Sequence, residues 1–239
     1  MPSSINIAPQ IGDQVALGYY RNFLEDQFEF YLEGYYKNLS NLIDYKNGAN
    51  LILNENVESE LVFGSGYAYG VEFFLKRKTG RLTGWLSYTY GRTIRLFDDI
   101  NDGEPFPARQ DRIHDLSLVL LYDISPRWKI SGSFIYYTGD AATFPSGRYV
   151  IGNVEVPYYT ERNGYRFPDY NRADFGITYN AKTKKRFESS WNFSVYNFYA
   201  KENAFVINFQ EKEDSPGENE AVQIALFKII PSISYNFKF

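Results

Sequence analysis

The sequence predicts an all-β protein, an antiparallel up-and-down transmembrane β-barrel segment of about nine strands. Three observations predict this class. Apolar and polar residues alternate along many segments, short and long connections alternate along the chain, and aromatic residues make up 19% of it. Aromatic side chains favour strands, and an alternation of period two puts successive side chains on opposite faces of a strand. No segment shows the periodicity of a helix.

The alternation marks the strands in chain order. The second strand shows it most clearly, because Phe28, Phe30 and Leu32 alternate with Glu29 and Glu33. Other strands carry the apolar sets Val15/Leu17/Tyr19, Val71/Phe73/Leu75, Leu116/Leu118/Leu120, Ala173/Phe175/Ile177, Trp191/Phe193/Val195 and Ile233/Tyr235/Phe237. We therefore predict strands at 10–22, 27–45, 58–77, 82–96, 110–123, 128–139, 168–180, 188–210 and 220–239.

The connections between these strands are sorted by length. Those after odd-numbered strands are short (23–26, 78–81, 124–127 and 181–187), and those after even-numbered strands are longer and polar (46–57, 97–109, 140–167 and 211–219). Outer-membrane barrels have short periplasmic turns and long extracellular loops. A water-soluble sandwich has no reason to sort its connections in this way.

Composition excludes several other classes. The 239 residues fit one large domain or two small ones. The absence of cysteine excludes disulfides and thiolate metal sites, and the single histidine excludes multi-histidine zinc sites. A net charge of -4 argues against nucleic-acid binding. Mean hydropathy is -0.41, and no stretch approaches the roughly 18 apolar residues of a membrane-spanning helix. Residues 1–22 show no signal-peptide pattern.

A membrane-spanning sheet reconciles the strong alternation with the negative hydropathy, because its outward face is apolar and its inward face is wet. Six tyrosines near strand ends fit the interfacial aromatic girdles: Tyr19, Tyr36, Tyr88, Tyr90, Tyr136 and Tyr199. The chain ends on the alternating aromatics Tyr235, Phe237 and Phe239, which resemble the C-terminal membrane-insertion signal of bacterial outer-membrane proteins. The alternative is a soluble all-β, aromatic-rich carbohydrate-binding module.

Five segments, in this order and spacing, resemble the barrel of TonB-dependent receptors. The stretches 66–75 and 80–90 resemble a barrel hairpin, 106–115 resembles the start of a strand after an extracellular loop, and 191–197 and 230–235 resemble the last two strands. The resemblance runs from about Ile7 to Phe239. It implies a 22-stranded barrel in the outer membrane of a Gram-negative bacterium, with the lumen closed by a plug domain.

The same resemblance implies a role and partners. Such receptors import scarce ligands (iron chelates, cobalamin, glycans or peptides), with energy transmitted by TonB, and they are not enzymes. Residues 1–239 correspond to the C-terminal part of the barrel domain, without plug or TonB box. The expected partners are the missing N-terminal barrel and plug portion, TonB through that portion, and outer-membrane lipid. A nine-stranded open sheet would leave two bare edges in lipid. No cofactor is expected.

The long connection 140–167 is the candidate ligand site. Its arginines and tyrosines suit an anionic or sugar-like ligand, through charge-assisted hydrogen bonds and ring stacking. The candidates are Arg148, Tyr149, Tyr158, Tyr159, Arg162 and Arg166. The alternative for this connection is a rim loop that packs on neighbouring loops.

Other chemistry is not predicted. His114 and Ser117 lie an odd number of positions apart on a strand, hence on opposite faces, and the chain has no nucleophile elbow, so no catalytic residue is proposed. The acidic stretch 98–104 lacks the calcium-loop spacing, so no metal ligand is proposed. The predicted inward-facing charges meet plug residues or lumen water: Glu29, Glu33, Lys37, Glu72, Arg172 and Asp174.

Overall fold

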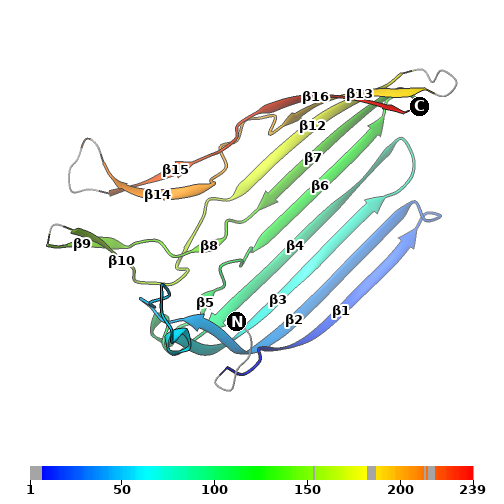
Figure 1. The fold of residues 1–239 in the computed structure, drawn as a ribbon. Coiled ribbons are helices and arrows are strands. Elements are labelled where there is room, and N and C mark those ends of the chain that lie inside the picture. Colours follow the sequence, from blue (N-terminus) through cyan, green and yellow to red (C-terminus); the bar gives the residue numbers. More distant parts are fainter. Residues whose placement is uncertain (1–6, 153, 182–186, 213, 215–218, 239) are drawn as a thin grey trace.

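A computed structural model describes residues 7–152, 154–181, 187–212, 214 and 219–238. Nine long strands form one antiparallel sheet in chain order (Figure 1). They are β1 (Ile11–Phe23), β2 (Phe28–Tyr45), β3 (Leu61–Arg77), β4 (Leu82–Leu96), β6 (His114–Asp123), β7 (Trp128–Tyr137), β12 (Tyr170–Asn180), β13 (Glu188–Tyr196) and β16 (Ile230–Lys238). The predicted fold class and number of strands are confirmed.

The register places all the apolar alternating positions on the same face of the sheet. One row of paired residues across five strands reads Leu75, Leu86, Leu118, Phe134 and Ala173. The neighbouring rows on the opposite face contain the predicted inward-facing residues Glu29, Glu33, Lys37, Glu72, Arg172 and Asp174. We refer to these two surfaces as the apolar face and the polar face.

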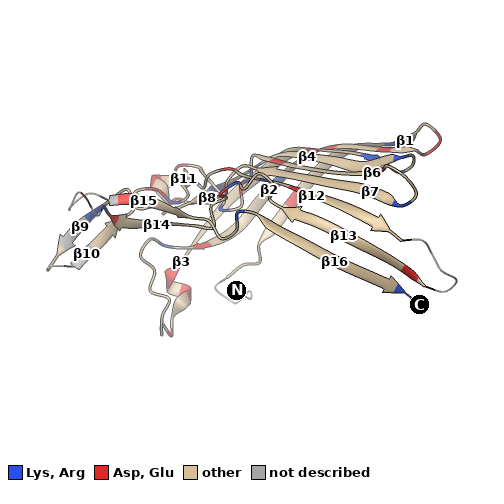
Figure 2. Ribbon diagram, turned by 90° about the horizontal axis from the view of Figure 1, so that it is seen from above, with Lys and Arg blue, Asp and Glu red and all other residues tan. Residues whose placement is uncertain are grey.

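The apolar face is not covered by any other described part of the chain. Figure 2 shows the sheet as a single curved layer. Leu17, Phe193 and Ile233 are 83%, 45% and 66% exposed. The buried core is instead a small cluster where the long connections lie: Leu42, Val62, Phe97, Ile100 and Phe106. A soluble sandwich would bury its apolar face against a second sheet, so this surface is suited to lipid.

Aromatic residues gather on the apolar face near both ends of the strands. Where the turns are short, Trp128 packs on Tyr179 and Trp191 on Tyr235, each pair with ring centroids 4.7 Å apart. The predicted girdle residues lie on this face by register: Tyr19, Tyr36, Tyr88, Tyr90 and Tyr136. The sixth, Tyr199, donates a hydrogen bond to Asn171, which belongs to the same face.

The sorting of connections by length is also observed. The short ones join β1 to β2, β3 to β4, β6 to β7 and β12 to β13, and the long ones lie at the opposite end (Figure 1). The turn after β1 uses three successive left-handed residues, Leu24, Glu25 and Asp26, with φ of 52°, 55° and 61°. The turn after β3 has Gly80 at φ 99°, a conformation that glycine adopts without steric cost.

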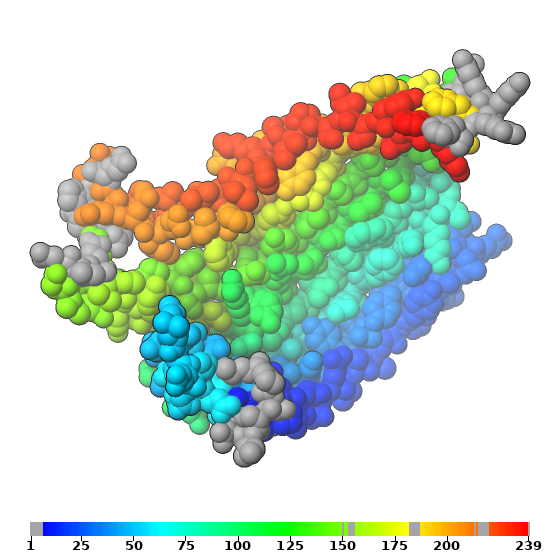
Figure 3. Space-filling view, viewed as in Figure 1, coloured from blue at the N-terminus to red at the C-terminus, as the bar shows by residue number. Residues whose placement is uncertain are grey.

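The long connections contain short elements of their own. They are the 3₁₀ turns η1 (Val57–Glu60) and η2 (Asn101–Gly103), β5 (Phe106–Pro107) beside β4, β8 (Ala141–Ala142) paired with β11 (Tyr165–Arg166), and the hairpins β9 (Gly147–Ile151) with β10 (Val154–Tyr158) and β14 (Val206–Glu211) with β15 (Asn219–Ile224). Figure 3 shows both hairpins extending beyond the sheet at the same end.

The predicted bounds of the last two long strands were wrong. Strands were predicted at 188–210 and 220–239, but β13 ends at Tyr196 and β16 begins at Ile230. The alternation continues through β14 and β15, because a hairpin outside the sheet has the same period as a strand within it. Asn197 ends β13 with a left-handed φ of 52°.

No helix in the described part of the chain is long and apolar enough to cross a membrane.

Candidate ligand pocket among the long connections

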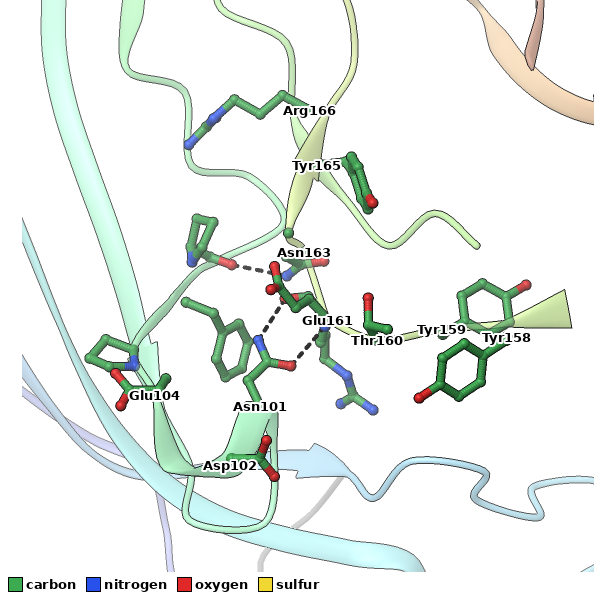
Figure 4. Close-up of a pocket in the computed structure, with 15 residues that line it drawn as sticks. Asn101, Asp102, Glu104, Tyr158, Tyr159, Thr160, Glu161, Asn163, Tyr165 and Arg166 are labelled. Carbon is green, nitrogen blue, oxygen red and sulfur yellow. Dashed lines mark hydrogen bonds between the residues drawn. The ribbon is translucent and has the colours of Figure 1, made fainter. Parts of the chain in front are cut away.

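A pocket of about 790 Å³ opens between the η2–β5 segment and residues 158–166 of the connection after β7 (Figure 4). Its lining is polar and aromatic, and comprises Asn101, Asp102, residues 104–107 and residues 158–166. A second hollow of about 440 Å³ shares residues 159–162 and is completed by Asn47, Gly48 and Thr143. Residues 159–162 therefore line two adjoining hollows.

A tight turn shapes this segment. Asn163 adopts a left-handed φ of 55°, which asparagine tolerates better than most residues. Its backbone N–H donates to the Thr143 hydroxyl at 3.0 Å. Its side-chain amide donates to the Pro107 carbonyl at 3.0 Å (Figure 4). The turn is thus tied both to β5 and to the start of its own connection.

Arg162 is directed toward the outer end of β2. Its guanidinium donates to Asp44 Oδ1 and to the Tyr45 carbonyl, each at 2.7 Å, and to Asn47 Oδ1 at 2.9 Å. Its backbone exchanges two hydrogen bonds with the Asn101 side chain, of 2.8 and 3.0 Å. All these contacts are internal to the protein.

Arg166 is held in the same manner. It forms an ion pair with Asp111, whose side chain is fully buried, and it donates to the Gly139 carbonyl at 3.1 Å. Arg92 lies on the other side of this carboxylate, with its Nε 3.3 Å from Asp111 Oδ2. Two arginines around one buried carboxylate form an anchor at the base of the connection.

The accessible groups of the pocket are tyrosines and carboxylates. Tyr158, Tyr159 and Tyr165 are 53%, 51% and 44% exposed. Three acidic residues of the lining are also exposed: Asp102, Glu104 and Glu161. Aromatic faces can stack on a ligand, and carboxylates accept hydrogen bonds from hydroxyl or amino groups.

The six candidates from the sequence do not all meet in one place. The pocket brings together Tyr158, Tyr159, Arg162 and Arg166. Arg148 and Tyr149 lie on the β9–β10 hairpin, where Arg148 is 3.7 Å from Glu211 of β14. Ring packing between Phe144 and Phe209, with centroids 5.2 Å apart, joins the same two connections.

Sequence reasoning missed the residues that the η2–β5 segment contributes to the pocket. Asn101, Asp102 and Glu104 belong to the acidic stretch 98–104, in which the sequence analysis proposed no ligand-binding residue. The available signal was that residues 97–109 and 140–167 are both long connections at the same end of the sheet, and their tips can therefore meet.

His114 and Ser117 lie on opposite faces of the sheet, as their spacing predicts. His114 begins β6 on the apolar face, and its Nδ1 lies 2.8 Å from the Tyr88 hydroxyl, whereas Ser117 belongs to the polar face. In the described ranges, no three histidine, cysteine, aspartate or glutamate side chains gather closely enough to hold a metal ion.

Arg112 is a well-paired cation near this end of the sheet. Its Nε donates to Asp140 Oδ1 at 2.8 Å, and its guanidinium lies 4.0 Å from the centre of the Tyr137 ring. The hydrogen bond to Asp140 raises the pKa of Arg112 above its ordinary value. This cation therefore links the start of β6 to the connection that follows β7.

Two outer-membrane or import receptors are among the solved structures that resemble the chain. The ferric-catecholate import receptor Fiu from K12 E. coli, in its closed form, matches with a TM-score of 0.61 and 13% identity over 98% of this chain and 28% of that chain. The ferripyoverdine receptor of the outer membrane of Pseudomonas aeruginosa matches with a TM-score of 0.59 and 14% identity over 84% of this chain and 25% of that chain. The chain thus spans about a quarter of the length of these receptors.

Sequence comparison gives the family directly. No curated protein matches the chain. The model of the family described as "TonB dependent receptor-like, beta-barrel" matches residues 3–198, which is most of the chain. The fold similarity to the two import and outer-membrane receptors agrees with this match. The chain belongs to the TonB-dependent receptor β-barrel family.

Proposed function

We propose that this chain is part of the wall of an outer-membrane transporter that imports a scarce nutrient in a Gram-negative bacterium. Residues 1–239 supply nine wall strands and four long extracellular connections. The part they play is binding and passage rather than catalysis, and it requires no cofactor.

The observation that carries the proposal is the register. Across nine strands it collects the alternating apolar residues on one exposed face and most of the charged strand residues on the other. This is the arrangement of a wall between lipid and a wet lumen. A soluble carbohydrate-binding module gains nothing from an uncovered apolar face of this extent.

The proposed partners follow from the two outer strands. Within the described residues, β1 and β16 each pair on one side only. In lipid, unpaired backbone groups are costly, so a preceding N-terminal barrel portion lies against both edges. A plug domain fills the lumen against the polar face, and TonB acts through that N-terminal part.

The ligand is collected in the pocket among the long connections. The ligand classes expected for this family are iron chelates, cobalamin, glycans and peptides. The exposed tyrosines and carboxylates support contacts by stacking and by hydrogen bonds to hydroxyl or amino groups. Of the six candidates from the sequence, Tyr158 and Tyr159 are the proposed contact residues. Arg162 and Arg166 are not, because their side chains already bind groups within the protein. Arg148 and Tyr149 lie on the β9–β10 hairpin, whose last residue, Tyr158, lines the pocket.

The test is whether the chain folds in water or needs a membrane environment. It is refolded with and without detergent, with and without the preceding barrel portion, and followed by circular dichroism and heat-modifiable gel migration. We expect aggregation in water and a heat-modifiable β-sheet in detergent with that portion. A monodisperse β-protein in water without detergent would overturn the proposal and favour the soluble module.

A further inference from the structure

We propose that Arg162 is the positioning residue of the pocket. Its hydrogen bonds hold residues 158–166 against the outer end of β2. When these bonds break, the segment can move and the pocket opens. The inference rests on the proposed function only in taking this pocket as the place where ligand is collected.

The contacts of Arg162 join parts of the chain that are far apart in sequence. Its side chain binds Asp44, Tyr45 and Asn47, more than a hundred positions away, while its backbone binds Asn101. Asp44 also accepts a hydrogen bond from Arg95 of β4 at 3.2 Å. One residue thus brings three connections together around the two hollows. A lysine in its place has only one nitrogen, which cannot reproduce this fork.

Polar contacts, rather than burial of apolar side chains, hold the segment in position. None of residues 158–166 is buried, and none belongs to the small core of Leu42, Val62, Phe97, Ile100 and Phe106. A segment with few buried apolar contacts opens at a small cost in free energy. Its position therefore depends on polar contacts, of which Arg162 makes the largest share.

The two arginines of the segment differ in how readily they can release. Arg166 pairs with Asp111, whose side chain is 0% exposed, so water cannot replace Arg166 there and the buried carboxylate would keep only Arg92 as a counter-charge. The side chains of Arg162 and Asp44 are 19% and 21% exposed, so water can replace each partner. Arg166 is therefore the fixed anchor, and Arg162 is the contact that can open.

Because the chain contains no cysteine, paired labels can be introduced without background. Asn50→Cys and Glu161→Cys place one spin label beyond β2 and one within residues 158–166, both at exposed positions. The distance between them is measured by double electron–electron resonance. The sample is the chain folded in detergent, with the preceding barrel portion if folding requires it.

We expect one narrow distance distribution with Arg162 present. Arg162→Ala broadens it and shifts it to longer distances. Arg162→Lys restores part of the narrow population, because it keeps the attraction to Asp44. Arg109→Ala is the matched control: Arg109 is an exposed arginine of a neighbouring connection, and its replacement leaves the distribution unchanged. Heat-modifiable migration stays the same in all four proteins.

An unchanged distribution in Arg162→Ala would overturn the inference, as would an equal change in Arg109→Ala. Loss of heat-modifiable migration in both Arg162 variants would also overturn it, because it would make Arg162 necessary to the fold rather than to the position of one segment. The distance measurement needs no ligand. Failure of the transport proposal would appear instead in the refolding experiment, so the two failures are distinguishable.

Discussion

Single residues on the polar face reveal where the sheet carries unfavourable charge. Glu33 and Glu72 are directly opposite each other in the register of β2 and β3. Like charges in this position destabilise a sheet. Glu29, four residues earlier on the same face of β2, differs because its Oε2 forms an ion pair of 3.0 Å with Lys78 Nζ.

Replacing Glu33 by glutamine should therefore stabilise the sheet. We expect a gain of about 0.5 kcal/mol in the free energy of unfolding at low ionic strength, because the repulsion with Glu72 is removed. The matched change Glu29→Gln should give a loss, since it removes an attraction. Urea unfolding of the detergent-folded protein, followed by tryptophan fluorescence, measures both. A gain that persists unchanged in high salt would contradict the electrostatic explanation.

Asn197 is the residue on which the last long connection depends. It is 1% exposed, and its backbone N–H donates to Asp174 Oδ1 at 2.9 Å. Its side-chain amide donates to the carbonyls of Lys201 and Lys228, and its side-chain oxygen accepts from the Lys201 N–H at 3.1 Å. One side chain therefore closes both ends of a connection of some thirty residues.

Asn197→Ala should destabilise the protein by roughly 1–3 kcal/mol, because it removes the hydrogen bonds that this buried side chain makes to Lys201 and Lys228. Asn197→Gly loses the same hydrogen bonds but keeps a residue suited to positive φ, so it should cost about 1 kcal/mol less. Urea unfolding of the two variants measures this difference. Equal costs would mean that the left-handed backbone imposes no strain.

The elements of the same connection are joined by an exposed ion pair. Lys228 binds Glu202, and this hydrogen bond lowers the pKa of the Glu202 carboxyl from its ordinary value of 4.5. A lowered folded-state pKa means that the pair favours the ordered connection above pH 4.5 and that this contribution is lost as the pH falls through the lowered value.

We therefore expect residues 197–212 to lose protection as the pH falls below 4.5 and through the lowered pKa of Glu202. Hydrogen exchange, corrected for the intrinsic pH dependence of the rate, measures it. At pH 7, Glu202→Gln should already show the reduced protection that the unsubstituted protein shows at low pH. Its protection should not change further on acidification. A pH response that persists in Glu202→Gln would assign the effect to another carboxyl group.

Strand β16 gives the sharpest test of what the apolar face contacts. Ile233 and Ser234 are adjacent, so they point to opposite faces of the strand. Ile233 is 66% exposed in the chain alone, and a soluble protein would tolerate a lysine there. In a bilayer the same lysine would lie in hydrocarbon.

Ile233→Lys should cost about 2–4 kcal/mol in the free energy of folding into lipid vesicles, the range for a cation near the middle of the membrane. Ser234→Lys, directed to the lumen, should cost much less. Urea titration of refolding into vesicles compares the two. Similar small costs at both positions would contradict a lipid-facing sheet. The insertion signal proposed for Tyr235, Phe237 and Phe239 is a separate prediction, and Phe239 lies outside the described residues.

The strands could be predicted from the sequence because alternation and register are linked. Once Phe30, Leu75 and Leu118 point to one side, antiparallel pairing carries the same face across the sheet. The β14–β15 hairpin was not separable from the sheet, because its alternation is the same and only Asn197 marks the break. Only part of the pocket was predicted. Charge and aromatic content identified residues 140–167, but they did not indicate that Arg162 binds groups within the protein rather than a ligand.

At the scale of the whole molecule, strand direction has a further consequence. Both outer strands, β1 and β16, run from the long connections toward the short turns. Two copies of the chain inserted with the same orientation would therefore meet edge to edge in parallel, whereas every seam inside the sheet is antiparallel. A barrel in which all neighbouring strands are antiparallel therefore needs a different segment between β16 and β1. The first and last strands of that segment both run from the short turns toward the long connections, so it has an odd number of strands. The geometry of the two edges thus excludes a ring of identical copies with antiparallel seams and sets the parity of whatever completes the wall.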